Sequence, residues 1–282
     1  MLRIAVPNKG ALSEAAISLL KEAGYRTRRQ GRELVLTDQS NDVELFFLRP
    51  RDIAVYVGQG TVHVGITGRD LLHDTAETAA VEHRALRFGA ATFRFAGPVG
   101  RYATVGDLAG ARIATSYDVL VRRYLEQQGV SATVVHLDGA VESSVQLGVA
   151  DAVADVVETG ATLKAAGLEV FGEPLLHSEA VLITRPSWQD HPAVRRLDRR
   201  IQGVLVAREY VLVDYDIPAG QLEQAVAITP GLQSPTVADL HDPRWKAVRS
   251  MVRQAEVNTI LDRLEEVGAR GIIVTDILAC RL

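Results

Sequence analysis

Cysteine is almost missing from this chain of 282 residues, because Cys280 is the only one. A single thiol cannot form an internal disulfide, and it excludes metal sites that are built on paired cysteines. The sequence also lacks an apolar run near the ~20 residues that cross a bilayer, and its first residues lead into a short strand instead of a signal peptide. We therefore expect a cytoplasmic protein with no membrane-spanning segment.

Clustered charge of one sign is lacking too. The net charge is −4 and the Lys and Arg residues are scattered, so we expect no nucleic-acid or anionic-membrane partner. The seven histidines show no metal-ligand spacing. The Walker A, G-x-G-x-x-G and G-x-S-x-G motifs are missing, which disfavours P-loop kinases, Rossmann dehydrogenases and serine hydrolases.

What the sequence does contain is a regular alternation of strand and helix signals. With 47% hydrophobic and 23% charged residues, the composition is that of a globular protein long enough for two or three compact units. Strands and helices alternate over about residues 1–90 and again over about 92–182, which predicts two α/β lobes with a cleft between them. The last part, from about residue 210, follows the βαββαβ order of a ferredoxin-like module.

The segment Ala150–Leu163 predicts a strand, an anion-binding loop and the start of a helix. Asp155 would lie near the carboxyl end of the strand, where open α/β sheets bind ligands, and it could accept hydrogen bonds from ribose hydroxyls. Backbone N–H groups of the loop would converge on an anion, which the helix N-terminus would favour by roughly 0.3–1 kcal/mol. The hydroxyls of Thr159 and Thr162 could donate to phosphate oxygens. A plain turn with Thr162 as the helix N-cap explains the local pattern equally well.

Acidic residues on either side of this loop are candidates for metal or substrate contacts. Asp151 or Glu158 could help to hold a hydrated Mg²⁺. We expect a helix over residues 140–147, which would bring Asp138 and Glu142 onto one face, one turn apart. They could form an acidic pair that faces the substrate, or Asp138 could simply cap the helix.

Other charged residues follow predicted strands. Lys9 would place a cation at the mouth of the cleft, suited to a diphosphate, although a solvated surface lysine is the simpler interpretation. Arg49 could form a bidentate pair with phosphate, and Asp70 is most simply a helix cap. The segment 112–117 again brings hydroxyl groups to a strand–helix junction. Together these junctions favour a phosphate-rich ligand.

The chain also resembles the ATP phosphoribosyltransferase family, which catalyses the committed first step of histidine biosynthesis. The resemblance extends over essentially the whole chain, through the segments VPNKG, FFLRPRDIAVYV, GITGRD and DGAVESSVQLG and the C-terminal module. The family signature is matched, at the correct spacings, by Glu142, Gly148, Ala150, Val153, Asp155, Val156, Thr159, Gly160, Thr162 and Leu163.

The resemblance implies an α/β fold with two catalytic lobes like those of periplasmic binding proteins and a C-terminal ferredoxin-like regulatory domain. Lobe I would comprise residues 1–90 and 184–209, lobe II residues 91–183 with the phosphoribosyl pyrophosphate loop, and the regulatory, histidine-binding domain residues 210–282. This is the long form of the enzyme, which works without a separate regulatory subunit and usually assembles as a hexamer built from dimers.

The reaction implied by the resemblance joins N1 of the ATP adenine to C1 of 5-phosphoribosyl 1-pyrophosphate, releases pyrophosphate and requires Mg²⁺. The attacking nitrogen carries a lone pair, so no strong general base is needed, and the ligands of the metal are not assigned. We expect catalytic roles for Lys9 and Arg49, facing phosphate oxygens, and for Asp155, orienting the ribose. The residues that we expect against the substrates are Asp70, Asp138, Glu142, Asp151, Asp155, Val156, Val157, Glu158, Thr159, Gly160, Ala161 and Thr162.

For the C-terminal module the resemblance implies feedback inhibition by L-histidine. Asp216 would pair with the cationic groups of the ligand, and Thr236 would hydrogen-bond to its polar atoms. Ordinary strand-end and turn residues are the alternative explanation of this pattern. The positions that match the inhibitor pocket are Asp216, Leu232, Ser234, Thr236, Met251 and Gly271.

Three other functions are disfavoured. A non-catalytic two-lobed protein that binds or senses a small molecule would be expected to carry an export signal or a DNA-binding segment. A purely regulatory relative would show erosion of the phosphate loop, whereas every signature position is intact. A different phosphoribosyltransferase would lack the C-terminal module.

Overall fold

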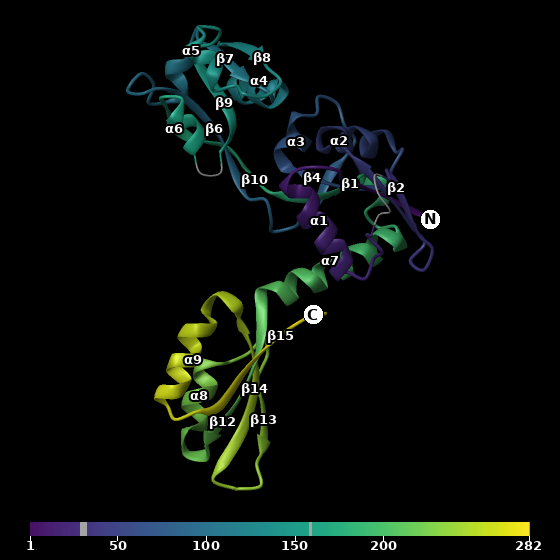
Figure 1. Ribbon diagram of the computed structural model, residues 1–282, viewed down its shortest axis with the longest axis vertical. Helices are drawn as coiled ribbons and strands as arrows, with labels where there is room; N and C mark the ends of the chain where they lie inside the picture. The colour runs from purple at the N-terminus through teal and green to yellow at the C-terminus, as the bar shows by residue number, and fades with distance from the viewer. Residues whose placement is uncertain (29–32, 158–159, 282) are drawn as a thin grey trace. The chain divides into compact units, whose positions relative to one another are not determined.

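The computed structural model describes residues 1–28, 33–157 and 160–281 (Figure 1). The chain divides into two compact units, of which the first comprises residues 1–18 with 25–195 and the second residues 19–24 with 196–282. The first unit contains two β-sheets and the second contains one. We call the parts of the first unit that are built on its six-stranded and five-stranded sheets lobe I and lobe II.

The six-stranded sheet is mixed, with parallel strands at its centre. Its strands and the helices between them are β1 (Leu2–Pro7), α1 (Ala11–Glu22), β2 (Val35–Asp38), β3 (Val43–Leu48), α2 (Pro50–Gln59), β4 (Val64–Gly68), α3 (Arg69–Asp74), β5 (Val81–Ala85) and β11 (Ala180–Thr184). The strand order is β2-β3-β1-β4-β11-β5. β1 runs parallel to β3 and β4, so the carboxyl ends of these three strands meet at one edge of the sheet. β11 is antiparallel to both of its neighbours, β4 and β5.

The sequence of this sheet fits a layer that is covered on both faces. Ile4, Ala5 and Val6 follow one another in β1 and are all fully buried, as is typical of a central parallel strand. Gly65 in β4 lets α2 approach closely, because a Cβ at this position would lie 2.4 Å from Cγ2 of Ile53. The packing of α2 on β4 therefore depends on the missing side chain.

The five-stranded sheet contains two strands that sequence patterns do not predict, β6 and β10. Its elements are β6 (Ala91–Pro98), β7 (Arg112–Thr115), α4 (Asp118–Gln127), β8 (Thr133–His136), α5 (Ser143–Gln146), β9 (Ala152–Val157), α6 (Ala161–Ala165) and β10 (Leu168–Ser178). The strand order is β10-β6-β9-β7-β8, with β7 parallel to β8 and β9 and with β6 antiparallel to β9 and β10. β10 ends only two residues before β11, so the two sheets are joined by a very short connection.

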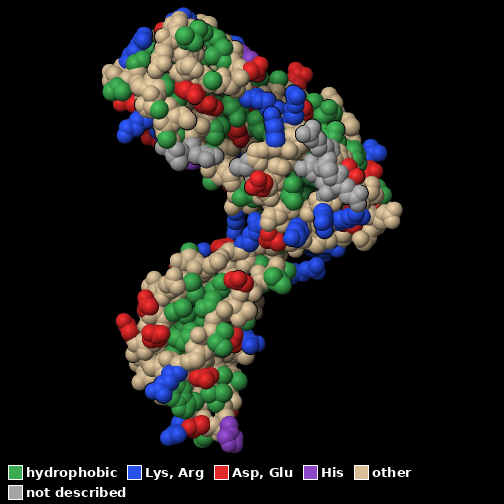
Figure 2. All heavy atoms as spheres, viewed as in Figure 1, with side chains coloured by type: hydrophobic (Ala, Val, Ile, Leu, Met, Phe, Trp, Pro, Cys, Tyr) green, Lys and Arg blue, Asp and Glu red, His purple; other side chains and the backbone are tan. Residues whose placement is uncertain are grey.

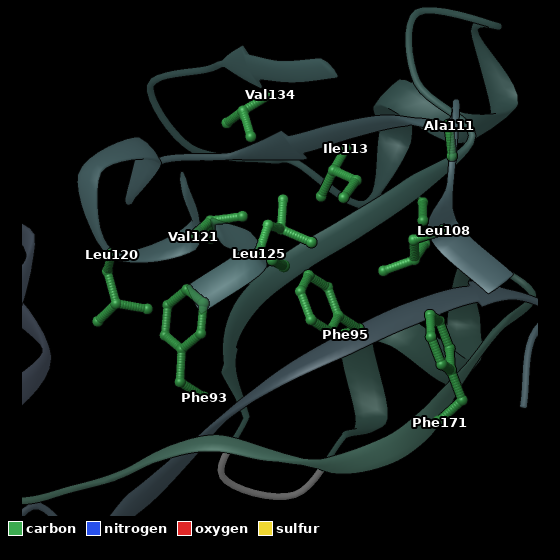
Figure 3. Packing of buried hydrophobic residues seen from close by; sticks show 12 residues of the cluster. Phe93, Phe95, Leu108, Ala111, Ile113, Leu120, Val121, Leu125, Val134 and Phe171 are labelled. Carbon is green, nitrogen blue, oxygen red and sulfur yellow. The ribbon is translucent and has the colours of Figure 1, made fainter. Parts of the chain in front are cut away.

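The core of lobe II lies on the α4 face of this sheet (Figure 3). Phe93 and Phe95 from β6 point into the same cluster as Ile113 from β7, and Val121 and Leu125 of α4 cover them. The opposite face is closed by a second cluster that includes residues of β9 and α6. Burial on both faces holds the end of β9 in place, where the predicted loop begins.

The second unit confirms the predicted βαββαβ module. It contains most of α7 (Pro192–Glu209), then β12 (Tyr210–Pro218), α8 (Leu222–Ile228), β13 (Thr236–Asp239), β14 (Trp245–Arg253), α9 (Val257–Glu266) and β15 (Arg270–Asp276). The strands are antiparallel in the order β13-β14-β12-β15. Alternate residues of β12, such as Val213 and Tyr215, pack with Leu264 of α9 in the core. The other residues of β12 lie on the opposite face of the sheet.

The expected helix over residues 140–147 is wrong in length. Only Ser143–Gln146 is helical, because Gly139 and Ala140 adopt left-handed backbone with φ of 89° and 47°. Asp138 and Glu142 therefore do not share one helical face.

On the surface, Lys and Arg side chains lie among Asp and Glu side chains on the visible face of both units (Figure 2). Among the described residues, no helix combines the length and hydropathy that a membrane span requires.

Candidate functional site

Two neighbouring cavities open at the carboxyl ends of strands in the first unit. One, of about 390 Å³, lies at the end of β9 and is called here the Asp155 cavity. The other, of about 370 Å³, lies at the edge where β1 and β4 end and is called the Asp70 cavity. Val156 lines both cavities, which are therefore adjacent. Both have the location expected of ligand sites in α/β sheets.

The Asp155 cavity is built from the predicted loop and the segment before α5. Gly160 precedes α6 with φ of 72°, a left-handed conformation that glycine adopts without strain. Asp155 accepts a hydrogen bond from the N–H of Val156 at 2.8 Å, which fixes one of its oxygens. Seven residues line the cavity: Glu142, Asp155, Val156, Val157, Gly160, Thr162 and Leu163.

The carboxyl group of Asp155 has a raised pKa. Burial raises its pKa above the usual range, and the nearby negative charges of Glu142 and Asp70 act in the same direction. The N–H of Val156 and the positive charge of Arg51 partly offset this effect. The ionised form of such a carboxyl group is stabilised by a cation or by hydrogen-bond donors of a ligand.

The Asp70 cavity combines a cation with a buried carboxylate. Both Lys9 and Asp70 line it. Lys9 is exposed, whereas Asp70 is only 8% exposed. The Ser178 hydroxyl donates to Oδ1 of Asp70 at 2.6 Å and accepts from the Asp70 N–H at 3.1 Å. Asp70 lies inside the first turn of α3, and Gly68 occupies the N-cap. The side chain of Asp70 therefore lines the cavity and does not cap the helix.

Tyr117 forms another wall of the Asp70 cavity. Its hydroxyl hydrogen-bonds to Asp70, and burial together with the negative charge of Asp70 raises its pKa well above the usual range. The phenol therefore stays protonated at neutral pH and donates to the carboxylate. The sequence does not single out Tyr117 or Ser178, although the segment 112–117 brings hydroxyl groups to a strand–helix junction.

Several predicted residues lie elsewhere. Asp151 precedes β9, at the opposite end from Asp155, and accepts hydrogen bonds from the backbone and guanidinium of Arg112 at 2.9–3.1 Å. Asp138 has a side chain that is 99% exposed and lies 3.4 Å from His136. Arg49 is exposed at the N-cap of α2, at the same sheet edge as Lys9, but does not line either cavity.

Three further residues were predicted in this segment. Ala161 begins α6. Glu158 and Thr159 lie outside the described residues.

The second unit has a cavity of its own, of about 410 Å³, on the open face of its sheet. Of the predicted inhibitor positions, it is lined by Asp216, Thr236 and Gly271. The β12–β15 pairing is irregular between Asp214 and Asp216, and a Cβ at Gly271 would lie 3.8 Å from Oδ2 of Asp216. The missing side chain leaves the carboxylate accessible. We call this site the Asp216 cavity.

The other inhibitor positions do not line this cavity. Met251 pairs with Leu212 in the sheet, while Leu232 and Ser234 lie in the segment that leads to β13. An ion pair that the sequence did not reveal, Arg249 Nε to Asp214 Oδ1 at 2.6 Å, forms part of the wall.

The residues that the structure describes form no complete metal site by themselves. No group of three or more His, Cys, Asp or Glu side chains in the described part of the chain could hold a metal ion. Mg²⁺ commonly binds through one or two carboxylates together with substrate phosphates, and Asp155 and Glu142 in one cavity fit that kind of site.

Comparison with known proteins gives one family match in the first part of the chain and another in the C-terminal part. The family model described as ATP phosphoribosyltransferase matches residues 49–203, and the model described as HisG, C-terminal domain, matches residues 207–279. The chain is 63% identical over 285 residues to the ATP phosphoribosyltransferase of Pseudarthrobacter chlorophenolicus and 60% identical over 282 residues to that of Kocuria rhizophila. In both alignments the whole of each chain is covered.

A solved structure matches most of the chain. It is the ATP phosphoribosyl transferase (HisG:HisZ) complex from Thermotoga maritima, with a TM-score of 0.62 and 27% identity. The alignment covers 72% of this chain and 99% of the Thermotoga chain.

Proposed function

Because the chain belongs to the ATP phosphoribosyltransferase family, we propose that its two adjacent cavities bind the two substrates of that reaction. The enzyme transfers the phosphoribosyl group of 5-phosphoribosyl 1-pyrophosphate to ATP, in the first step of histidine biosynthesis. The Asp155 cavity takes the phosphoribosyl group and the Asp70 cavity takes ATP. The observation that carries this assignment is the shared wall at Val156, which lets a bond form between ligands of the two sites. A non-catalytic sensing protein is not favoured.

The phosphoribosyl group fits the Asp155 cavity by its chemistry. Gly160 and the start of α6, including the Thr162 hydroxyl, offer donors to the 5-phosphate, and Asp155 accepts from the ribose hydroxyls. During the reaction the C1–O bond to pyrophosphate breaks as the bond from N1 of adenine to C1 forms, and positive charge develops on the sugar. The carboxylates of Asp155 and Glu142 favour that charge.

ATP fits the Asp70 cavity. The carboxylate of Asp70 is held by Ser178 and Tyr117, which leaves it fixed as an acceptor for the N–H or O–H donors of a nucleoside. Lys9 supplies a positive charge for phosphate oxygens at the cavity wall, and Arg49 lies at the same edge of the sheet. Fixed groups of this kind contribute by positioning the attacking nitrogen rather than by removing a proton.

A magnesium ion would be held jointly by protein and substrate. Asp155 and Glu142 are the carboxylates that would contact it, together with oxygens of the bound pyrophosphate. When bound, Mg²⁺ neutralises charge on the departing pyrophosphate. Asp151 forms an ion pair with Arg112 and would not contact the metal.

The C-terminal module supports a proposal of inhibition by L-histidine at the Asp216 cavity. Asp216 would pair with a cationic group of the amino acid, and Thr236 would hydrogen-bond to it. We further propose a cytoplasmic enzyme that assembles as a hexamer built from dimers and needs no separate regulatory subunit. Residues 1–90 and 184–209 would form the first catalytic domain, 91–183 the second, and 210–282 the regulatory domain.

One assay tests both the reaction and its inhibition by L-histidine. Purified protein is mixed with ATP, 5-phosphoribosyl 1-pyrophosphate and Mg²⁺, and pyrophosphate release is followed with and without L-histidine and with excess EDTA. We expect release that stops with EDTA and falls with histidine. Folded protein that releases no pyrophosphate would contradict the catalytic proposal, whereas release insensitive to histidine would contradict only the regulatory one.

A further inference from the structure

The first turn of α4, in lobe II, is capped by a carboxylate from lobe I. Asp74, the last residue of α3, accepts hydrogen bonds from the N–H groups of Val119 at 3.1 Å and Leu120 at 3.2 Å. Tyr117 occupies the N-cap position of α4 and supplies no side-chain cap of its own. The helix start, whose N–H groups have no partner within the helix, therefore depends on a residue of another lobe.

Asp74 is in turn held by Arg51. Nη1 of Arg51 in α2 donates to Oδ2 of Asp74 at 2.9 Å, while Oδ1 serves the helix. The side chain of Asp74 is only 8% exposed, and burial raises its pKa despite the helix N–H groups and Arg51. A carboxylate buried in this way needs its partners, so the contact has one preferred geometry.

The same guanidinium lies over the ring of Tyr117. The central carbon of Arg51 is 4.5 Å from the ring centroid, and Phe93 contacts the ring edge-on at a centroid distance of 5.0 Å. The Tyr117 N–H also donates to Oγ1 of Thr115 at 3.0 Å. The ring is thus fixed on several sides, and its hydroxyl meets Asp70 in the Asp70 cavity.

A second contact joins α3 and α4, and here the side chain comes from α4 and the backbone groups from the end of α3. Arg123, further along α4, donates to the carbonyl oxygens of His73 at 3.3 Å and Ala76 at 2.6 Å. The end of α3 therefore receives positive charge from α4, and the start of α4 receives negative charge from α3, as helix dipoles favour.

We propose that Arg51 and Asp74 are positioning residues for phosphoribosyl transfer, which hold Tyr117 so that its hydroxyl donates to Asp70 in the ATP site. The proposal rests on the assignment of ATP to the Asp70 cavity. Arg51 and Asp74 act through Tyr117 and Asp70, since neither of them lines that cavity. Small displacements of such groups change rates strongly, because reaction depends on the alignment of the reacting atoms.

A double-mutant cycle separates this role from a purely structural one. Arg51→Met, Tyr117→Phe and the double variant are compared with wild type for kcat and for the KM of each substrate. We expect kcat/KM for ATP to fall roughly tenfold in each single variant and no further in the double variant, because coupled neighbours are not additive. The KM for 5-phosphoribosyl 1-pyrophosphate should change much less.

Three further variants test whether the effect comes from the contacts of Arg51. Asp74→Asn keeps an acceptor for α4 but weakens the contact with Arg51, so it should lower kcat/KM for ATP in the same direction, and Arg51→Lys should restore part of the activity lost in Arg51→Met. Arg3→Met removes a comparable ion pair, to Glu44 at 3.3 Å, and should leave the kinetics unchanged. Losses that multiply in the double variant, or that fall mainly on the other substrate, would overturn the proposal. An inactive wild-type protein would instead reject the proposed function.

Discussion

At the scale of single residues, the cost of building the site is clearest at Asp155. In the unfolded chain this carboxyl ionises in its ordinary range, whereas burial raises its pKa in the folded protein. The folded state then binds the proton more tightly. The carboxyl therefore favours folding fully below the unfolded pKa, and this contribution is lost as the pH rises through the folded pKa. Near neutrality the ionised group opposes folding.

Asp155→Asn should therefore separate stability from activity. We expect the variant to melt at a higher temperature than wild type near pH 7, with the difference vanishing at acid pH where both side chains are uncharged. Its kcat/KM for 5-phosphoribosyl 1-pyrophosphate should fall by roughly tenfold to a hundredfold, as expected when a charged hydrogen-bond partner is lost. Thermal melts over pH and steady-state kinetics measure both effects, with Asp190→Asn, an exposed surface carboxylate, as control. A variant that melts below wild type near pH 7 would contradict this account of the buried charge.

Ser178 offers a second test at this scale. Ser178→Ala removes the hydroxyl that holds Oδ1 of Asp70 at 2.6 Å, so we expect the KM for ATP to rise by about tenfold, corresponding to ~1.4 kcal/mol. Ser40→Ala is the matched control, because Ser40 donates to Asp38 at 2.9 Å at the β2 turn. Equal effects of the two variants on the KM for ATP would show that Ser178 has no special role there.

At the scale of the elements, local patterns were sufficient where a strand or helix carries its own signal. The buried apolar run of β1 and the alternation in β12 were both recognisable, and so was the strand β9. The Asp138–Glu142 segment was misjudged because Ala140, a residue with high helix propensity, has a positive φ there, which its helix propensity does not predict.

Long-range contacts explain why part of the site escaped prediction. The hydroxyl of Ser178 reaches Asp70 across a sequence separation of 108 residues, from the end of a strand that no local pattern revealed. Tyr117 is similar, since its role follows from contacts with α2 and α3, which come from another lobe. Sequence spacing carries no information about such pairs.

Gly65 gives a prediction about packing between elements. Gly65→Ala would bring a Cβ within 2.4 Å of Ile53, so α2 must move away from β4, and we expect a loss of about 1–3 kcal/mol in the free energy of unfolding. Gly220→Ala, where nothing lies within 4 Å of the added Cβ, should change stability little. Combining Gly65→Ala with Ile53→Val should not recover the loss, because the clashing Cγ2 remains, whereas Ile53→Ala should recover part of it. Chemical denaturation checks these values, and a neutral Gly65→Ala would contradict the packing.

At the scale of the whole molecule, the Asp155 and Asp70 cavities and the Asp216 cavity belong to different compact units. Binding of the substrates and of the proposed inhibitor should therefore be separable by mutation. Coupling between the two, if inhibition occurs, is then a free energy transmitted through the chain or its assembly and not competition for one site.

Asp216→Ala should weaken L-histidine binding at least tenfold and leave pyrophosphate release without histidine unchanged. Asp155→Ala and Thr162→Val should do the reverse, weakening 5-phosphoribosyl 1-pyrophosphate far more than histidine. Calorimetric titration with each ligand measures these affinities, and tenfold corresponds to ~1.4 kcal/mol. Equal losses of both ligands in either set would argue against separate sites.

The position of β11 has a consequence for how the protein is made on the ribosome. β11 lies between β4 and β5 in the six-stranded sheet, although lobe II is synthesised between β5 and β11. A nascent chain that has just emerged through residue 98 holds β4 and β5 without the strand that belongs between them. Vectorial synthesis, which lets many N-terminal domains fold first, cannot complete lobe I here. Its sheet closes only after residue 184 has left the exit tunnel, so the two lobes mature together.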